Sequence, residues 1–273
     1  MRKYGFAFLA VIILFLSCSS DKKEALLLIE KARNLYEKKE YGSAKLTLDE
    51  LKTTYPKESA LRKEALDLVR DIETEEQKRN IVFCDSMIIV CQSEVDSMKN
   101  LFLFEKTAYD PIGKYIDKTY NPQPGHASKY IKIYVTESGD LVLNSVYRGN
   151  PIKHNRIKVS VPSGEYKETE SIPFDGGNNY SFTDLGVTYE TVTYQKGRDN
   201  GVIRFIYHFA DQKISLEYSG AKKTSPYILS EKEKKALVNT VNLASALKDT
   251  EQFKNEKEKA EKRLEYLENK KDG

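Results

Sequence analysis

The chain has 273 residues, 40% of them hydrophobic, which suffices for one or two domains with apolar cores. Its 44 basic and 41 acidic residues give a formal net charge of +3, or 3 − 2 = +1 if Arg2 and Lys3 are removed with a leader. Because charges of both signs are interleaved, no nucleic acid or other polyanion is expected as a partner.

The N-terminus carries the pattern of a bacterial leader. Arg2 and Lys3 precede an apolar run at residues 4–16, which is too short to span a membrane as a stable helix. The run ends at Ser17 and Cys18. This arrangement resembles a lipoprotein signal, although Phe15 and Leu16 depart from the usual residues before the cysteine, and an ordinary secretory peptide is the alternative.

The resemblance implies cleavage before Cys18 and acylation of its thiol and new amino group, with chains such as palmitate. Two or more acyl chains anchor a protein durably, because each buried CH₂ contributes about 0.8 kcal/mol. We therefore predict a signal peptide over residues 1–17, a tether over 18–23 and a lipid-anchored place in the bacterial cell envelope. Ser19 and Ser20 favour the outer membrane by analogy, and the face of the membrane stays open.

Residues 24–56 read as two helices joined by a polar turn and stopped by Pro56. The stretch resembles a single tetratricopeptide repeat at four positions, namely Ala32, Ala44, Leu48 and Pro56. It departs from that repeat at Leu28, Lys31 and Leu35. The resemblance implies a helical hairpin and an interaction scaffold. Since repeats need stacked neighbours, the segment after Pro56 is expected to cap the hairpin.

A long helix is predicted over residues 57–108. Its first part has one apolar face, formed by Leu61, Ala65, Leu68 and Ile72. A second seam follows at steps of three and four, formed by Ile81, Cys84, Ile88, Cys91, Val95, Met98 and Phe102. The polar stretch at 73–80 separates the two seams, so we expect one helix with two partners. A break near Asn80 is the alternative.

Cys84 and Cys91 lie seven residues apart in this seam. Their Cα atoms would be about 10.5 Å apart in a straight helix, whereas a disulfide needs roughly 4.4–6.8 Å. We expect buried free thiols, with an intermolecular bridge across a helix dimer as the alternative.

After a linker at 109–128, residues 129–228 change to strand patterns. Alternating runs occur at 130–135, 141–147, 156–161, 166–172, 180–182, 187–194, 202–209 and 213–218. Turn sequences separate them, and no helix is expected between them. The region therefore predicts an antiparallel sheet or sandwich.

The last segment, 229–270, begins with the capping-box pattern of Ser230 and Glu233. A sparse apolar seam follows, formed by Leu243, Ala246, Phe253, Ala260, Leu264 and Leu267. Pairing with the seam at 81–102 would bury both. We therefore predict an α+β fold, with a helical hairpin and a long antiparallel helix pair, or stalk, into which the β module is inserted. An intermolecular coiled coil, which would make a homo-oligomer, is the alternative.

The layout of leader, hairpin, long helices and β module resembles uncharacterised envelope lipoproteins of Bacteroidota. The run at residues 172–180 adds to this likeness. The resemblance brings no assigned activity.

Candidate catalytic and metal-binding residues are scarce. His126, His154 and His208 are far apart and lack metal-ligand spacing, and no serine or cysteine lies in a nucleophile motif. The loop at 175–179 lacks the acidic series of a calcium-binding loop and indicates a turn. No Gly-rich phosphate loop occurs. The sequence predicts no catalytic residue, no metal and no cofactor.

Tyrosines of the β region are the remaining candidates for ligand binding. Six of them could form a platform for sugar rings or a protein: Tyr147, Tyr166, Tyr180, Tyr189, Tyr194 and Tyr207. Half-buried strand tyrosines are the alternative interpretation.

The leading hypothesis is a non-enzymatic lipoprotein anchored to the membrane through Cys18, acting as a scaffold or binding module for an unidentified protein partner. A carbohydrate-binding surface protein that uses the exposed tyrosines is the second hypothesis. A hydrolase, which would need acidic residues converging in a deep cleft, is the third.

Overall fold

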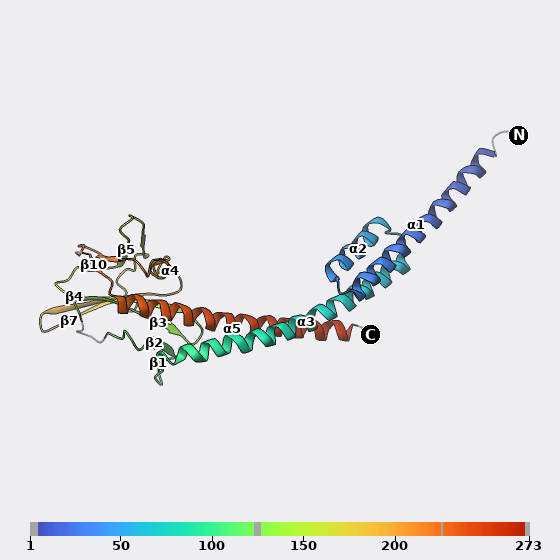
Figure 1. Ribbon diagram of the computed structural model, residues 1–273. Helices are drawn as coiled ribbons and strands as arrows, with labels where there is room; N and C mark the ends of the chain where they lie inside the picture. The colour runs from blue at the N-terminus through green and yellow to red at the C-terminus, as the bar shows by residue number, and fades with distance from the viewer. Residues whose placement is uncertain (1–4, 123–126, 225, 271–273) are drawn as a thin grey trace. The chain divides into compact units, whose positions relative to one another are not determined.

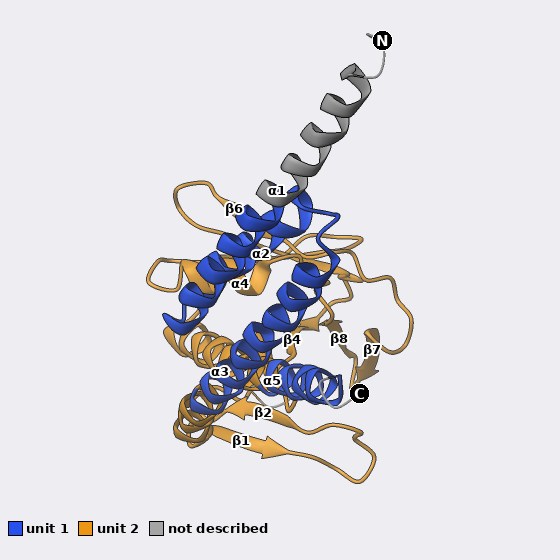
Figure 2. Ribbon diagram, turned by 90° about the vertical axis from the view of Figure 1, so that its right-hand side faces the viewer, with its two compact units in different colours: residues 1–86, 254–273 blue, residues 87–253 orange. Residues whose placement is uncertain are grey.

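The computed structural model describes residues 5–122, 127–224 and 226–270, with side chains from Asp21 onward. Over these residues the chain forms five helices and two antiparallel sheets of six and four strands (Figure 1). About 48% of the chain is helix and 22% strand, which confirms the predicted α+β class. The chain divides into a helical unit, residues 1–86 and 254–273, and a β unit, residues 87–253 (Figure 2).

The helical unit is built on α1 (Gly5–Glu37), α2 (Tyr41–Thr54) and the first part of α3 (Ser59–Lys99). Small residues at Ala25, Ala32 and Ala44 are fully buried where α1 meets α2. Absence of larger side chains there lets the two backbones approach closely. The rest of the core is aliphatic and aromatic, formed by Ile29, Tyr41, Leu48, Leu51, Leu61, Ala65 and Ile72. A hairpin capped by the next helix is therefore present, as expected.

The predicted leader overlaps the start of α1, but the side chain of Cys18 lies outside the described residues, as does His126. Its lipidation therefore stays a prediction. Within the described part of the chain, no helix is both long and apolar enough to cross a membrane.

The long helix α3 runs without a break from Ser59 to Lys99, through the polar stretch where an interruption near Asn80 was the alternative. In the helical unit it pairs with the last part of α5 (Glu231–Asn269). Arg263 forms an ion pair with Glu73, and Lys257 lies 2.7 Å from Asp85. Glu73 comes before Asp85 along α3, whereas its partner Arg263 comes after Lys257 along α5. The two helices are therefore antiparallel, as predicted, and they belong to one chain.

The β unit contains the remaining parts of these two helices. Val95 and Met98 of α3 pack there with Leu243 and Leu247 of α5. The N-terminal capping box of α5 forms as predicted: the Glu233 amide donates to Ser230 Oγ at 3.3 Å, and the Ser230 amide donates to Glu233 Oε2 at 2.8 Å.

The larger sheet has the strand order β1-β2-β3-β4-β8-β7 and the smaller one the order β10-β9-β5-β6, with every pairing antiparallel. The larger sheet comprises β1 (Phe102–Glu105), β2 (Lys114–Asp117), β3 (Lys129–Thr136), β4 (Leu141–Gly149), β7 (Asn179–Asp184) and β8 (Val187–Tyr194). The smaller sheet comprises β5 (Arg156–Ser160), β6 (Tyr166–Glu168), β9 (Ser215–Ser219) and β10 (Tyr227–Ile228). One core joins both sheets to the N-terminal part of α5, including Ile131, Leu143, Ile157, Val192, Leu216 and Leu237.

The β region begins earlier than the sequence predicted. The helix expected to reach residue 108 ends at Lys99, and Phe102 starts β1. The predicted linker at 109–128 contains β2, which pairs with both β1 and β3. Phe102 still packs beside Val95. The apolar side chain of Phe102 therefore fitted the spacing expected of a helix, but pairing within the sheet gives its backbone the conformation of a strand.

The run at 202–209 was expected to be a strand, and this prediction was wrong: it forms α4 (Val202–His208). Gly201 adopts a left-handed conformation with φ of 82°, and Asp199 Oδ2 accepts hydrogen bonds from the amides of Gly201 and Ile203 at 3.2 Å. These contacts start a helix. His208 is consequently a helical residue.

The run at 166–172 was expected to be a full strand, but β6 ends at Glu168. Beyond it the chain leaves the sheet, and the Glu170 amide donates to the carbonyl of Arg198.

Candidate functional site

A groove lies between α2 and α3 in the helical unit, with a volume of about 680 Å³. Its apolar part is formed by Leu48, Ala65, Leu66 and Val69. Leu66 is 51% exposed, although it neighbours the buried core residue Ala65. We call this hollow the α2/α3 groove. It follows α3 from Ser59 to Val69, a rise of about 15 Å, or roughly three helical turns.

The rim of the α2/α3 groove is basic. Lys52, Arg62 and Lys63 are exposed along it. Among the described residues that line the groove, Asp49 is the acidic one. The Lys45 ammonium is 2.8 Å from Glu76, so its charge is already paired. An apolar floor with a cationic rim suits the apolar face of a helix that carries acidic residues along its flank.

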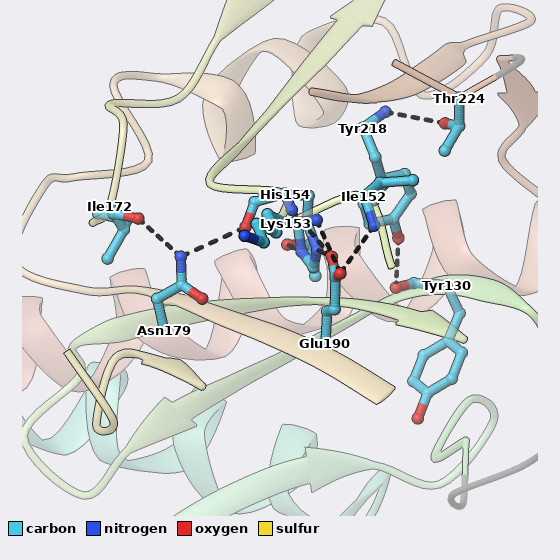
Figure 3. A network of polar contacts seen from close by, with 10 residues as sticks. Tyr130, Ile152, Lys153, His154, Ile172, Asn179, Glu190, Tyr218 and Thr224 are labelled. Carbon is cyan, nitrogen blue, oxygen red and sulfur yellow. Dashed lines mark hydrogen bonds and ion pairs between the residues drawn. The ribbon is translucent and has the colours of Figure 1, made fainter. Parts of the chain in front are cut away.

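A second hollow, of about 560 Å³, lies in the β unit. We call it the His154 pocket. His154, Glu190, Asn179 and Phe174 are among the residues that line it. Figure 3 shows its polar floor, where Glu190 of β8 faces the loop before β5.

Behind this floor, three side chains form a hydrogen-bonded chain that the sequence did not reveal. Ser145 Oγ is 3.0 Å from His154 Nε2, and His154 Nδ1 is 2.9 Å from Glu190 Oε2. Because a carboxylate only accepts, His154 Nδ1–H donates to Glu190, and Nε2 is left to face the serine hydroxyl. The order is that of a catalytic triad.

The surroundings of Ser145 limit what this chain of groups can do chemically. Ser145 is 0% exposed, and it is not part of the wall of the His154 pocket. A nucleophile must reach a substrate atom, and this hydroxyl contacts neither solvent nor the pocket. The geometry therefore describes a buried structural network.

Glu190 holds the loop before β5. Its Oε1 accepts from the amides of Ile152 and Lys153 at 2.9 and 2.7 Å, and its Oε2 accepts from the amide and ring of His154 at 2.8 and 2.9 Å. Burial is the largest single influence on the pKa of Glu190 and would raise it, but the hydrogen bonds from His154 and Lys153 outweigh it and hold the pKa below its usual range.

The loop itself is tightly built. Lys153 has a φ of 52°, a left-handed conformation that costs energy for a lysine. A Cβ at Gly220 would lie 2.0 Å from the Lys153 carbonyl oxygen, so only glycine fits there.

Two of the six predicted platform tyrosines lie on one face of the larger sheet. Tyr180 is directly opposite Thr191, whereas Tyr189 lies between Arg148 and Phe182 in the register. The Phe182 and Tyr189 rings stack at 4.9 Å with an interplanar angle of 4°, and the Arg148 guanidinium is 5.6 Å from the Tyr189 ring. Both faces of Tyr189 are thus covered by its neighbours in the sheet.

The other four tyrosines are dispersed, so the prediction of one shared platform was wrong. Tyr194 is fully buried, and burial raises its pKa to about 12. Tyr147 packs edge-on against His154 inside the core. Tyr166 is exposed, on the smaller sheet, and Tyr207 lies on α4, where its hydroxyl donates to Asn242. The alternation of residues along a strand could not show which of its two faces is buried and which is exposed.

Cys84 and Cys91 are buried free thiols, as expected, and burial raises the pKa of both. Within the described residues, no group of three or more His, Cys, Asp or Glu side chains could hold a metal ion. Asp175 closes the turn that the sequence indicated, accepting from the amides of Gly177 and Asn179 at 2.9 Å.

Comparison of the chain with models of protein families, with curated proteins and with solved structures finds no match.

Proposed function

We propose that this protein is a non-enzymatic binding protein of the bacterial cell envelope, anchored through lipid on Cys18, and that the α2/α3 groove takes a helix of a protein partner. One observation supports the docking part of this proposal. Beside its well-packed core, the helical unit has an apolar groove that α1 does not cover. The leader pattern supports the anchor.

The occupant that fits is an amphipathic helix of about ten residues, from the groove length of about 15 Å and a rise of about 1.5 Å per residue. Its apolar side would contact Leu66 and Val69, and acidic residues on its flank would meet Lys52, Arg62 and Lys63. Because the rim charges are exposed, salt should weaken the complex mainly by slowing association.

A photo-crosslinking amino acid in place of Leu66 tests the groove in envelope preparations. The matched control places the same amino acid at Leu46, which is 74% exposed on α2 and does not line the groove. We expect an adduct from position 66 only, with its crosslinked peptide in an acidic amphipathic helix. Equal adducts from both positions, or a peptide of another kind, would contradict the docking proposal.

A fatty-acid probe tests the anchor separately. Wild-type protein should be labelled in growing cells, and Cys18→Ala should not. Labelling of both proteins would remove the proposed anchor but leave the groove proposal standing.

A further inference from the structure

The His154 pocket in the β unit contains groups that the buried network does not use. Its floor is already satisfied, because the two oxygens of Glu190 accept four hydrogen bonds from Ile152, Lys153 and His154. A ligand would therefore be recognised by the wall of the pocket.

Asn179 supplies an acceptor to that wall. Its side-chain Nδ2 donates to the carbonyls of Ile172 and His154 at 2.7 and 3.3 Å, which uses both of its hydrogens (Figure 3). Asn179 is 6% exposed, and no described residue donates to its Oδ1. This oxygen is not itself sealed from solvent, so it can accept a hydrogen bond from a ligand in the pocket.

Three other wall residues add complementary chemistry. Phe174 is 69% exposed, although aromatic rings usually lie inside. Lys153 offers a cationic donor, and Ser181 offers a hydroxyl that both donates and accepts. The wall thus combines an apolar ring with separate donors and an acceptor.

The charges favour a neutral ligand. Glu190 lies in the floor of the pocket, where hydrogen bonds from the loop hold its pKa below its usual range. This carboxylate opposes a bound anion, while the positive charge of Lys153, a residue of the wall, opposes a bound cation.

We propose that the His154 pocket binds one neutral sugar residue. A hydroxyl of the sugar would donate to Asn179 Oδ1, other hydroxyls would meet Lys153 and Ser181, and the C–H face of the ring would lie on Phe174. The site is distinct from the tyrosine platform that the sequence suggested and from the α2/α3 groove.

Titration with methyl glycosides of glucose, galactose, mannose and N-acetylglucosamine, followed by ligand-observed NMR and calorimetry, tests the proposal. We expect at least one glycoside to bind. Phe174→Ala should weaken that binding about three- to tenfold, the usual range for one aromatic contact. Ser181→Ala should weaken it by a similar or smaller factor, as for one hydrogen bond. Both side chains are exposed, so both variants should fold.

The control is Phe182→Ala, which removes an exposed ring from the opposite face of β7 and should leave the affinity unchanged. Leu66→Asp in the α2/α3 groove should also leave it unchanged, so that this test is independent of the docking proposal. Binding only of oligosaccharides that end in one of these sugars would support the proposal with a glycan terminus as the source. The proposal would be overturned if neither the methyl glycosides nor such oligosaccharides bind, or if Phe174→Ala and Phe182→Ala lose affinity equally.

Discussion

The helical unit and the β unit bury their cores by different means. Among its described residues, the core of the helical unit consists of small, aliphatic and aromatic side chains, and its buried polar residues are few, such as Thr47 and Thr74. The β unit adds a connected polar network around Glu190 and His154 to an aliphatic and aromatic core.

This difference has consequences for binding. Apolar packing is non-directional, so a short helical unit can be stable and still leave the α2/α3 groove uncovered. A buried carboxylate that accepts three backbone amides fixes one loop conformation. The β unit therefore holds the wall of the His154 pocket in place, with acceptors and donors at defined positions.

The largest expected effect comes from a charge in the core that α3 shares with the β unit. Val95 is 1% exposed and packs with Phe102 and Leu243. Val95→Asp should destabilise the protein by about 3–5 kcal/mol, because a buried carboxylate would lack a partner. Chemical denaturation followed by circular dichroism measures this loss. Val82→Asp is the matched control, since Val82 is 65% exposed on the same helix, and a comparable loss there would contradict this interpretation.

A core truncation tests how the helical unit is stabilised. Leu51 is fully buried. Leu51→Ala should cost about 2–4 kcal/mol, through lost burial and the cavity that remains. Leu66→Ala in the open groove should change the free energy of unfolding by less than about 0.5 kcal/mol. Hydrogen exchange resolved by peptides would place the first effect in α1 and α2. Equal losses in the two variants would mean that the groove is filled in the free protein.

Removal of one charge tests the polar network. Glu190→Gln should cost about 2–3 kcal/mol, because one of its atoms becomes a donor facing the donors of the loop. Glu170→Gln, which alters an exposed pair with Arg198, is the control. If both variants unfold at the same denaturant concentration, the network does not stabilise the β unit.

The same carboxylate makes stability depend on pH. The pKa of Glu190 is lower in the folded protein than in the unfolded chain, so its contribution is complete above the unfolded pKa. That contribution is lost as the pH falls through the folded pKa. Wild type should lose stability at acid pH more steeply than Glu190→Gln, and parallel curves of melting temperature against pH would contradict this.

The smallest effect is expected for the ion pair between α3 and α5 in the helical unit. Arg263 is half exposed beside Glu73. Arg263→Ala should change the free energy of unfolding by at most about 0.5 kcal/mol, because exposed ion pairs contribute little. A loss above about 1 kcal/mol would show that this pair, and not the apolar seam, holds the helices together.

The site was less predictable than the fold. Glu190 and His154 are 36 positions apart in sequence, and Ser145 is one residue in an alternating strand. The pairing of β4 with β8 places Ser145 and Glu190 in neighbouring strands, and the loop before β5 adds His154, so no local spacing could reveal the three residues. Likewise, Leu66 looks like any apolar helix residue, because the sequence does not say which faces of α3 are covered.

By itself, the sequence determined the features that depend on neighbouring residues. The capping box at Ser230, the stop after the second helix at Pro56 and the apolar seam of α5 follow from hydrogen bonds and spacing within a few residues. These features suffice for an α+β fold with long paired helices.

Tertiary structure decided what depends on distant partners. It ended α3 at Lys99, because β1 gains a partner in β2. It separated the tyrosines, and it placed Asn179 with an unused acceptor in a pocket wall. The physical reason is that burial and strand pairing are satisfied by the whole chain, whereas caps, turns and helical periodicity are satisfied locally.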